Sequence, residues 1–152
     1  MSVTDVSIPI YRYFEEISAI PRGSGNEEGI SSYLAAFAEK RGLKYVRDAL
    51  NNVVIYKPGS KGREQEPPLM LQAHMDMVCE QIGGKGHDFR KDPITLIRDG
   101  NILRADGTTL GADDGVGVSW MLAMLADDSL SHPPLECVFT VSEERAWTAR
   151  GA

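Results

Sequence analysis

Cysteine is scarce in this sequence, and its thiols are far apart. Cys79 and Cys137 are the two cysteines among 152 residues, and neither belongs to a Cys-x-x-Cys spacing. Neither a disulfide framework nor a zinc site built from thiolates is therefore indicated. We expect both cysteines to be small buried residues in a reducing compartment.

The sequence also lacks a basic excess and a long apolar run. Lysine and arginine number 16 against 22 aspartates and glutamates, which gives a formal net charge of −6. Because no basic stretch could neutralise a row of phosphates, we expect no nucleic-acid partner. Residues 120–126, one of the longest apolar stretches, fall far short of a membrane span, and residues 1–10 lack the plan of a signal peptide. These absences predict a cytoplasmic protein that does not bind membranes.

What is present is the composition of one globular domain, with 42% hydrophobic and 25% charged residues. Apolar residues at helical spacing predict helices, and short β-branched or apolar runs between turn residues predict strands. The expected helices are 9–19, 27–41 and 111–126, and the expected strands are 52–56, 69–73, 95–97, 102–103 and 135–141. Because strands alternate with amphipathic helices, we predict an α/β fold, a layered sheet of mostly parallel or mixed strands with flanking helices.

Local features of these elements can be predicted as well. Ser24 or Asn26 is placed to cap the helix 27–41. The apolar run 135–141 predicts a strand buried on both faces. In the helix 111–126, Val116 and Trp120 lie at helical spacing, and we expect Trp120 to belong to the core rather than to a substrate pocket.

Ligand sites in such sheets gather beyond the carboxyl ends of strands, and polar clusters lie at such positions here. His74 and Asp76 follow the strand 69–73 directly, where alternation sends both side chains to the same side. A neutral imidazole can bind zinc, and a nearby carboxylate can orient its other ring nitrogen. On its own, however, a surface histidine with an accidental acidic neighbour explains the pair better.

A second cluster, Asp113-Asp114, opens the helix 111–126, where the helix dipole favours negative charge. The pair could simply cap the helix. One cap needs only one carboxylate, and glycines at 107, 111, 115 and 117 suggest backbone held close to another group. Capping and metal binding both remain open from these residues.

A third cluster, Glu143-Glu144, follows the strand 135–141. Like charges side by side repel unless a cation or solvent separates them. A solvated strand end is the usual explanation. The alternative is that one carboxylate binds a metal while the other takes a proton from an activated water.

Together the three clusters offer imidazole and oxygen donors without thiolate, which suits a catalytic rather than a structural zinc site. In order and spacing they resemble the co-catalytic two-zinc dipeptidases, and most closely the aminoacyl-histidine (Xaa-His) dipeptidases. The connecting text extends this resemblance over nearly the whole chain to Glu144, in the segments LQAHMDMV, HDFRKDPI, GTTLGADDGVGV and HPPLE.

The resemblance implies a role for five of these residues. His74 would bind one zinc ion, Asp113 would bridge two, and Glu144 would bind the other. Asp76 would be the carboxylate behind His74, and Glu143 would be the general base.

Other positions are implied to have no metal-binding role. Asp114 occupies a variable position, although the peptide between it and Asp113 is cis in the family. His87 and His132 match no ligand of the family, so we expect both to be structural or exposed.

The resemblance also implies a substrate and an assembly. The substrate would be a dipeptide hydrolysed by activated water, and the full-length family would form homodimers. Residues 1–144 would be the N-terminal part of the catalytic domain. In the family two further ligands, a carboxylate and a distant histidine, lie downstream together with a lid domain. We therefore expect the 152-residue chain to be inactive by itself.

Residues 145–152 depart from the family pattern, which continues with a small, glycine-rich segment. Codons for Arg-Ala-Trp-Thr-Ala-Arg can spell Thr-Gly-Met-Asp-Gly-Ala when read one base earlier, which fits that pattern. A one-base frameshift is our hypothesis for this tail, and sequencing the gene locus tests it. The alternatives for function are an inactive fragment and a related tripeptidase or N-acyl amino acid deacylase.

Overall fold

A mixed sheet of four strands forms the centre of the computed structural model, which describes residues 2–148, with the backbone alone for 146–148. The strand order is β1-β2-β6-β3. The strands are β1 (Lys44–Arg47), β2 (Val53–Lys57), β3 (Leu69–His74) and β6 (Leu135–Thr140). β2 is antiparallel to both neighbours, whereas β3 and β6 are parallel. The mixed α/β sheet agrees with the prediction.

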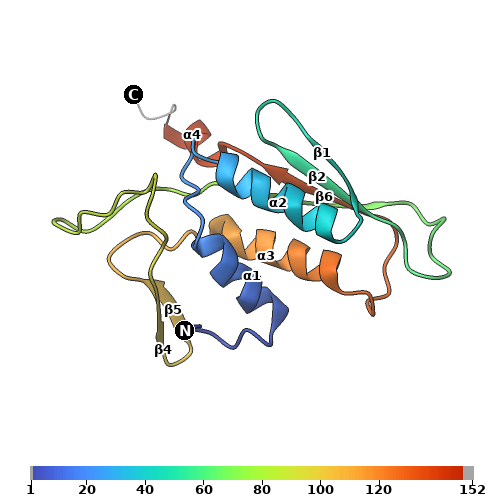
Figure 1. Ribbon diagram of the computed structural model, residues 1–152, viewed down its shortest axis with the longest axis horizontal. Coiled ribbons are helices and arrows are strands. Elements are labelled where there is room, and N and C mark those ends of the chain that lie inside the picture. The colour runs from blue at the N-terminus through green and yellow to red at the C-terminus, as the bar shows by residue number, and fades with distance from the viewer. Residues whose placement is uncertain (1, 149–152) are drawn as a thin grey trace.

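Four helices and a separate hairpin complete the described chain (Figure 1). The helices are α1 (Pro9–Ser18), α2 (Glu28–Lys40), α3 (Ala112–Ala126) and α4 (Glu143–Thr148). The hairpin pairs β4 (Leu96–Asp99) with β5 (Ile102–Ala105), as its turn residues predict. Of the tail 145–152, residues 149–152 lie outside the described part of the chain.

The edge strand β1 is missed by the sequence patterns. Its residues KYVR alternate between exposed and half-buried positions, so no apolar period marks the strand. β1 is defined by its pairing with β2, in which Tyr45 faces Ile55. Pairing across a sheet is a tertiary contact, and a run of four residues gives little local signal of it.

The core lies between the helices and one face of the sheet. Leu135, Cys137 and Phe139 of β6 are fully buried there and pack in one cluster with Leu34 and Leu122 of the helices. The intervening residues of β6 are only half-buried. The expectation of a strand buried on both faces is therefore wrong, since β6 has one covered face and one partly open face among the described residues.

The buried face of α3 also differs from the expected one. Val118 and Leu122 are fully buried, but Val116 is 42% exposed and Trp120 is 54% exposed. Trp120 is therefore not a core residue. Apolar residues surround α3 on nearly every side, so periodicity alone leaves its inward face undecided. The helix α1 and the sheet select that face by packing against it.

Two smaller expectations are wrong. The residue that caps α2 is Glu27, with no side-chain cap hydrogen bond, so neither Ser24 nor Asn26 serves there. Of the cysteines, Cys137 is buried as expected, but Cys79 is exposed.

Among the described residues, no helix is both long and apolar enough to span a membrane.

Candidate metal centre

The topology of the sheet brings the three polar clusters to one edge. β3 and β6 run in parallel with His74 opposite Thr140, so the ends of both strands lie side by side. Glu143 and Glu144 begin α4 directly beyond β6, and Asp113 lies at the start of α3. Ligand sites typically form at such carboxyl ends.

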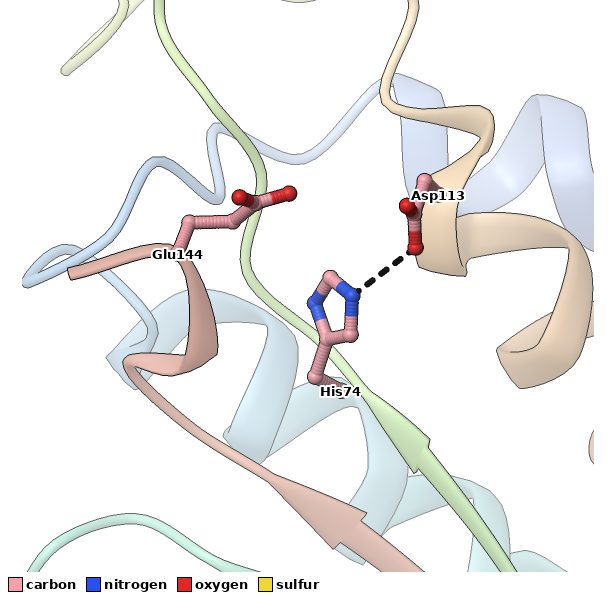
Figure 2. A group of neighbouring side chains, drawn as sticks. All are labelled: His74, Asp113 and Glu144. Atoms are coloured by element: carbon pink, nitrogen blue, oxygen red, sulfur yellow. Dashed lines mark hydrogen bonds and ion pairs between the residues drawn. The ribbon is translucent and has the colours of Figure 1, made fainter. Parts of the chain in front are cut away.

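The expected ligands meet at this edge. One donor atom each from His74, Asp113 and Glu144 lies within 4.8 Å of the others. Figure 2 shows the three side chains reaching from separate segments toward a common space. The Nε2 atom of His74 is 3.0 Å from Oδ1 of Asp113 and 4.0 Å from Oε2 of Glu143. The fifth predicted residue, Asp76, lies 3.4 Å from the other ring nitrogen of His74, so the structure brings all five predicted site residues together.

Asp113 is separated from Asp114 by a break in the helix. Both residues have non-helical backbone angles, and the peptide bond between them is cis, as the resemblance implies. The Asp114 carboxylate accepts a hydrogen bond from the amide of Gly117 at 3.1 Å, whereas Asp113 points to His74. One carboxylate therefore caps the helix after the break, and the other faces His74 in the cluster.

His74 is buried between two acidic groups. Its Nδ1 atom is 3.0 Å from the backbone oxygen of Asp76 and 3.4 Å from the Asp76 carboxylate. Burial lowers the pKa of His74, but the hydrogen bond with Asp113 and the charge of Asp76 outweigh burial and raise it above its ordinary value. Oxygen acceptors at both ring nitrogens favour the imidazolium form, which has two N–H donors.

Asp76 organises the backbone of the glutamate pair. Its carboxylate is fully buried and accepts hydrogen bonds from the amides of Glu143 at 3.1 Å and Glu144 at 3.2 Å. It also accepts one from the Ser24 hydroxyl at 2.6 Å. Asp76 thus lies behind His74 as expected, and in addition it fixes the start of α4. Ser24 is a supporting residue that the sequence patterns do not reveal.

The segment that leads to Glu143 is held from two other elements. Asn52 accepts a hydrogen bond from the amide of Val141 at 3.0 Å. Glu27, which is buried, accepts bonds from the amide and the hydroxyl of Ser142, both at 3.1 Å. These bonds set the direction in which the glutamate pair leaves β6.

The glutamate pair lies in a negative environment. Loss of hydration raises the pKa of Glu144, His74 lowers it, and the charges of Glu143 and Asp113 raise it further, with a net upward shift. The Glu143 side chain remains 46% exposed. A bound cation would relieve the repulsion among these carboxylates.

Arg22 is a second residue that sequence patterns miss. It lies between α1 and α2 and is only 2% exposed, and its guanidinium donates hydrogen bonds to the backbone oxygens of Met75 and Gly111. Burial lowers its pKa to about 10, against the opposing effect of Asp76. Nothing in the local sequence marks it, because a cation between two helices is usually solvated.

The donor set suits zinc. Imidazole and carboxylate are ordinary ligands of a catalytic zinc ion, and neither cysteine belongs to the cluster. His87 packs against Phe89, and His132 is buried with its Nδ1 atom 2.7 Å from the oxygen of Pro133. Both histidines therefore have the structural surroundings expected of them.

The sequence is similar to that of a known dipeptidase. No family model matches the chain. The chain is 43% identical over 136 residues to the cytosol non-specific dipeptidase of Escherichia coli K12, a match that covers 90% of this chain and 28% of the relative.

Solved structures agree with the sequence match. The aminoacylhistidine dipeptidase of Vibrio alginolyticus has a TM-score of 0.90 at 38% identity, over 95% of this chain and 30% of that one. A tripeptidase of Staphylococcus aureus has a TM-score of 0.72 at 25% identity, over 95% of this chain and 38% of that one. The chain thus spans about a third of the length of its relatives. It is a homologue of the cytosol non-specific and aminoacylhistidine dipeptidases of the M20 family and corresponds to part of their length.

Proposed function

We propose that this chain supplies part of the active site of a zinc-dependent dipeptidase that acts on Xaa-His-type dipeptides. The convergence of His74, Asp113 and Glu144 within 4.8 Å is the observation that carries the proposal. The Xaa-His preference rests on the aminoacylhistidine dipeptidase relative.

The ligands are assigned by their positions. His74 would hold one zinc ion, Glu144 a second, and Asp113 would lie between them as the bridge. The Asp113 carboxylate suits this place because its side chain is 88% exposed and is already turned toward His74. Bound zinc would polarise the substrate carbonyl and lower the pKa of water.

Glu143 is the proposed general base. Its carboxylate is half-exposed and lies 4.0 Å from the His74 ring, so it can reach a water beside the proposed ligands. Glu143 would accept a proton from that water and return it to the leaving amine. Asp76 would act through others, since it orients His74 and fixes the amides of Glu143 and Glu144.

The 152-residue polypeptide holds three of the five ligands that the resemblance implies. We therefore expect these residues alone to be inactive and the complete site to include downstream residues. We also propose a cytoplasmic location, because the Escherichia coli relative is named a cytosol dipeptidase. The family resemblance alone supports the proposal of a homodimer for the full-length protein. A tripeptidase activity is the second candidate, favoured by the structural likeness to the tripeptidase.

Metal titration tests the proposal directly. Co²⁺ bound by imidazole and carboxylate gives visible absorption bands, and we expect these bands with the wild-type chain and their loss in His74→Ala. A wild-type chain that gives no bands at any Co²⁺ concentration would contradict the proposed site. His132→Ala is the control, because His132 lies outside the cluster.

A further inference from the structure

Arg22 joins the two backbone segments that carry His74 and Asp113. Its Nη1 donates to the oxygen of Met75 at 3.1 Å, and its Nη2 donates to the oxygen of Gly111. Met75 directly follows His74, and Gly111 comes two positions before Asp113. One planar guanidinium therefore spans the end of β3 and the start of α3.

The cost of burying Arg22 argues against a role in stability alone. Its Nε atom has no hydrogen-bond partner among the described residues, although the side chain is buried. A buried ion with an unmatched donor destabilises a fold, and apolar side chains of similar volume often serve packing better. What an apolar residue cannot supply is the pair of fixed hydrogen bonds to two separate carbonyls.

Two of the glycines around the aspartate pair make room for this guanidinium. A Cβ atom at Gly111 would lie 2.5 Å from Nη2 of Arg22, and one at Gly115 would lie 2.6 Å from it. The glycine-rich sequence therefore admits Arg22 close to the backbone of α3. The sequence analysis inferred that these glycines hold the backbone close to another group, and for Gly111 and Gly115 that group is the Arg22 side chain.

We propose that Arg22 is a positioning residue of the candidate metal centre, which holds the segments of His74 and Asp113 so that both side chains would be in place to bind metal. The inference rests on the proposed function. A shift of either segment would separate the donor atoms, and residues that orient ligands typically change metal affinity on the order of 10–100-fold.

Lys57 provides a matched control within the same fold. It is also a buried cation, 8% exposed, and its ammonium donates to the backbone oxygens of Met124 at 3.1 Å and Asp127 at 2.7 Å. Lys57 pairs with Leu135 at the opposite end of β6 from Glu143, a strand length of roughly 17 Å away. Both cations hold carbonyls, but only Arg22 holds segments that bear ligands.

The experiment compares Co²⁺ affinity and urea midpoints in Arg22→Met, Arg22→Lys and Lys57→Met. We expect Arg22→Met to weaken Co²⁺ binding on the order of 10–100-fold and Lys57→Met to leave it unchanged, with both variants losing stability. Arg22→Lys, which keeps the charge and part of the hydrogen bonding, should fall between wild type and Arg22→Met. Removing a cation near carboxylates would by itself strengthen metal binding. A weaker affinity in Arg22→Met therefore cannot come from the lost charge and indicates that the ligands have moved.

Each outcome distinguishes the hypotheses. Unchanged or tighter Co²⁺ binding in Arg22→Met would overturn the positioning role of Arg22. The proposed function would still stand in that case, provided that the wild-type chain binds Co²⁺. Equal losses in Arg22→Met and Lys57→Met would reduce Arg22 to a stability role. If Arg22→Met does not fold, Arg22→Lys decides, because wild-type affinity in that variant also overturns the inference. A wild-type chain without Co²⁺ binding would overturn the metal site and this inference together.

Discussion

The Nε2 atom of His74 lies 3.0 Å from Oδ1 of Asp113, although 39 positions separate the two residues in the chain. The other ring nitrogen faces the backbone oxygen of Asp76 at 3.0 Å. In the metal-free protein this arrangement stabilises a protonated imidazole between two acceptors. Since zinc binds the neutral ring, protons and zinc compete for His74.

The stability of the metal-free chain should therefore fall as pH rises. The pKa of folded His74 is raised above the ordinary value of 6.5. The stabilisation of the fold by protonated His74 is fully present below the pKa of His74 in the unfolded state. It is lost as pH rises through the pKa of His74 in the folded state. Urea midpoints measured with a chelator from pH 6 to pH 8.5 should show this loss, and the difference between wild type and His74→Gln should shrink across the same range. A difference that grows with pH would contradict the assigned environment of His74.

Zinc should bind weakly and below two ions per chain. A catalytic zinc ion normally has three protein ligands, whereas each ion would have two here, one of them shared. Calorimetry should show low affinity for the wild type and a further loss in Asp113→Ala. Two tight zinc ions per chain would show that no further ligands are needed.

The two glutamates should differ in a completed enzyme. We propose a chimaera of residues 1–144 with the downstream part of the Escherichia coli dipeptidase, and expect it to hydrolyse aminoacyl-histidine dipeptides where the 152-residue chain does not. Glu143→Ala should lower turnover by roughly 10²–10⁴-fold while metal stays bound. Glu144→Ala should lose metal together with turnover. Full activity without Glu143 would exclude it as the base, and activity of the short chain that Glu143→Ala abolishes would show the downstream ligands to be dispensable.

Asp76→Asn should destabilise the fold. The buried carboxylate accepts hydrogen bonds from Ser24, Glu143 and Glu144. An amide would keep one oxygen acceptor but replace the other oxygen with an NH2 group, which cannot accept from the amide N–H that it faces. A buried group left without its partner costs about 1–3 kcal/mol, which chemical denaturation can measure. Asp99→Asn, at an exposed position, is the control and should change little. Equal effects of the two substitutions would show that the Asp76 bonds contribute little.

A pair of valines tests the orientation of α3. Val118→Ala removes two buried methyl groups and should lower the free energy of unfolding by about 2 kcal/mol. Val116→Ala, at a position 42% exposed, should change it by less than about 0.5 kcal/mol. Urea unfolding measures both losses. A larger loss in Val116→Ala than in Val118→Ala would show that the face of α3 with Val116, and not the face with Val118, packs in the core.

Much of the candidate site can be predicted from local sequence because its residues follow regular elements. His74 ends a strand, Glu143 follows one, and Asp113 opens a helix, positions that periodicity and turn residues indicate without a structure. The order and spacing of the three clusters then carry the family resemblance, and the dipeptidase relatives confirm it.

Only the tertiary structure shows which residues support the site and which face of α3 is buried. The local sequence does not indicate the roles of Arg22 and Ser24 at the site, since each acts through partners more than fifty positions away. The inward face of α3 depends on which neighbours pack against a helix that is apolar nearly all round. Sequence determined which side chains could bind a metal, because ligand chemistry belongs to the residue type. Packing and hydrogen bonds between distant segments determined where those side chains meet, because spacing in space is a property of the whole fold.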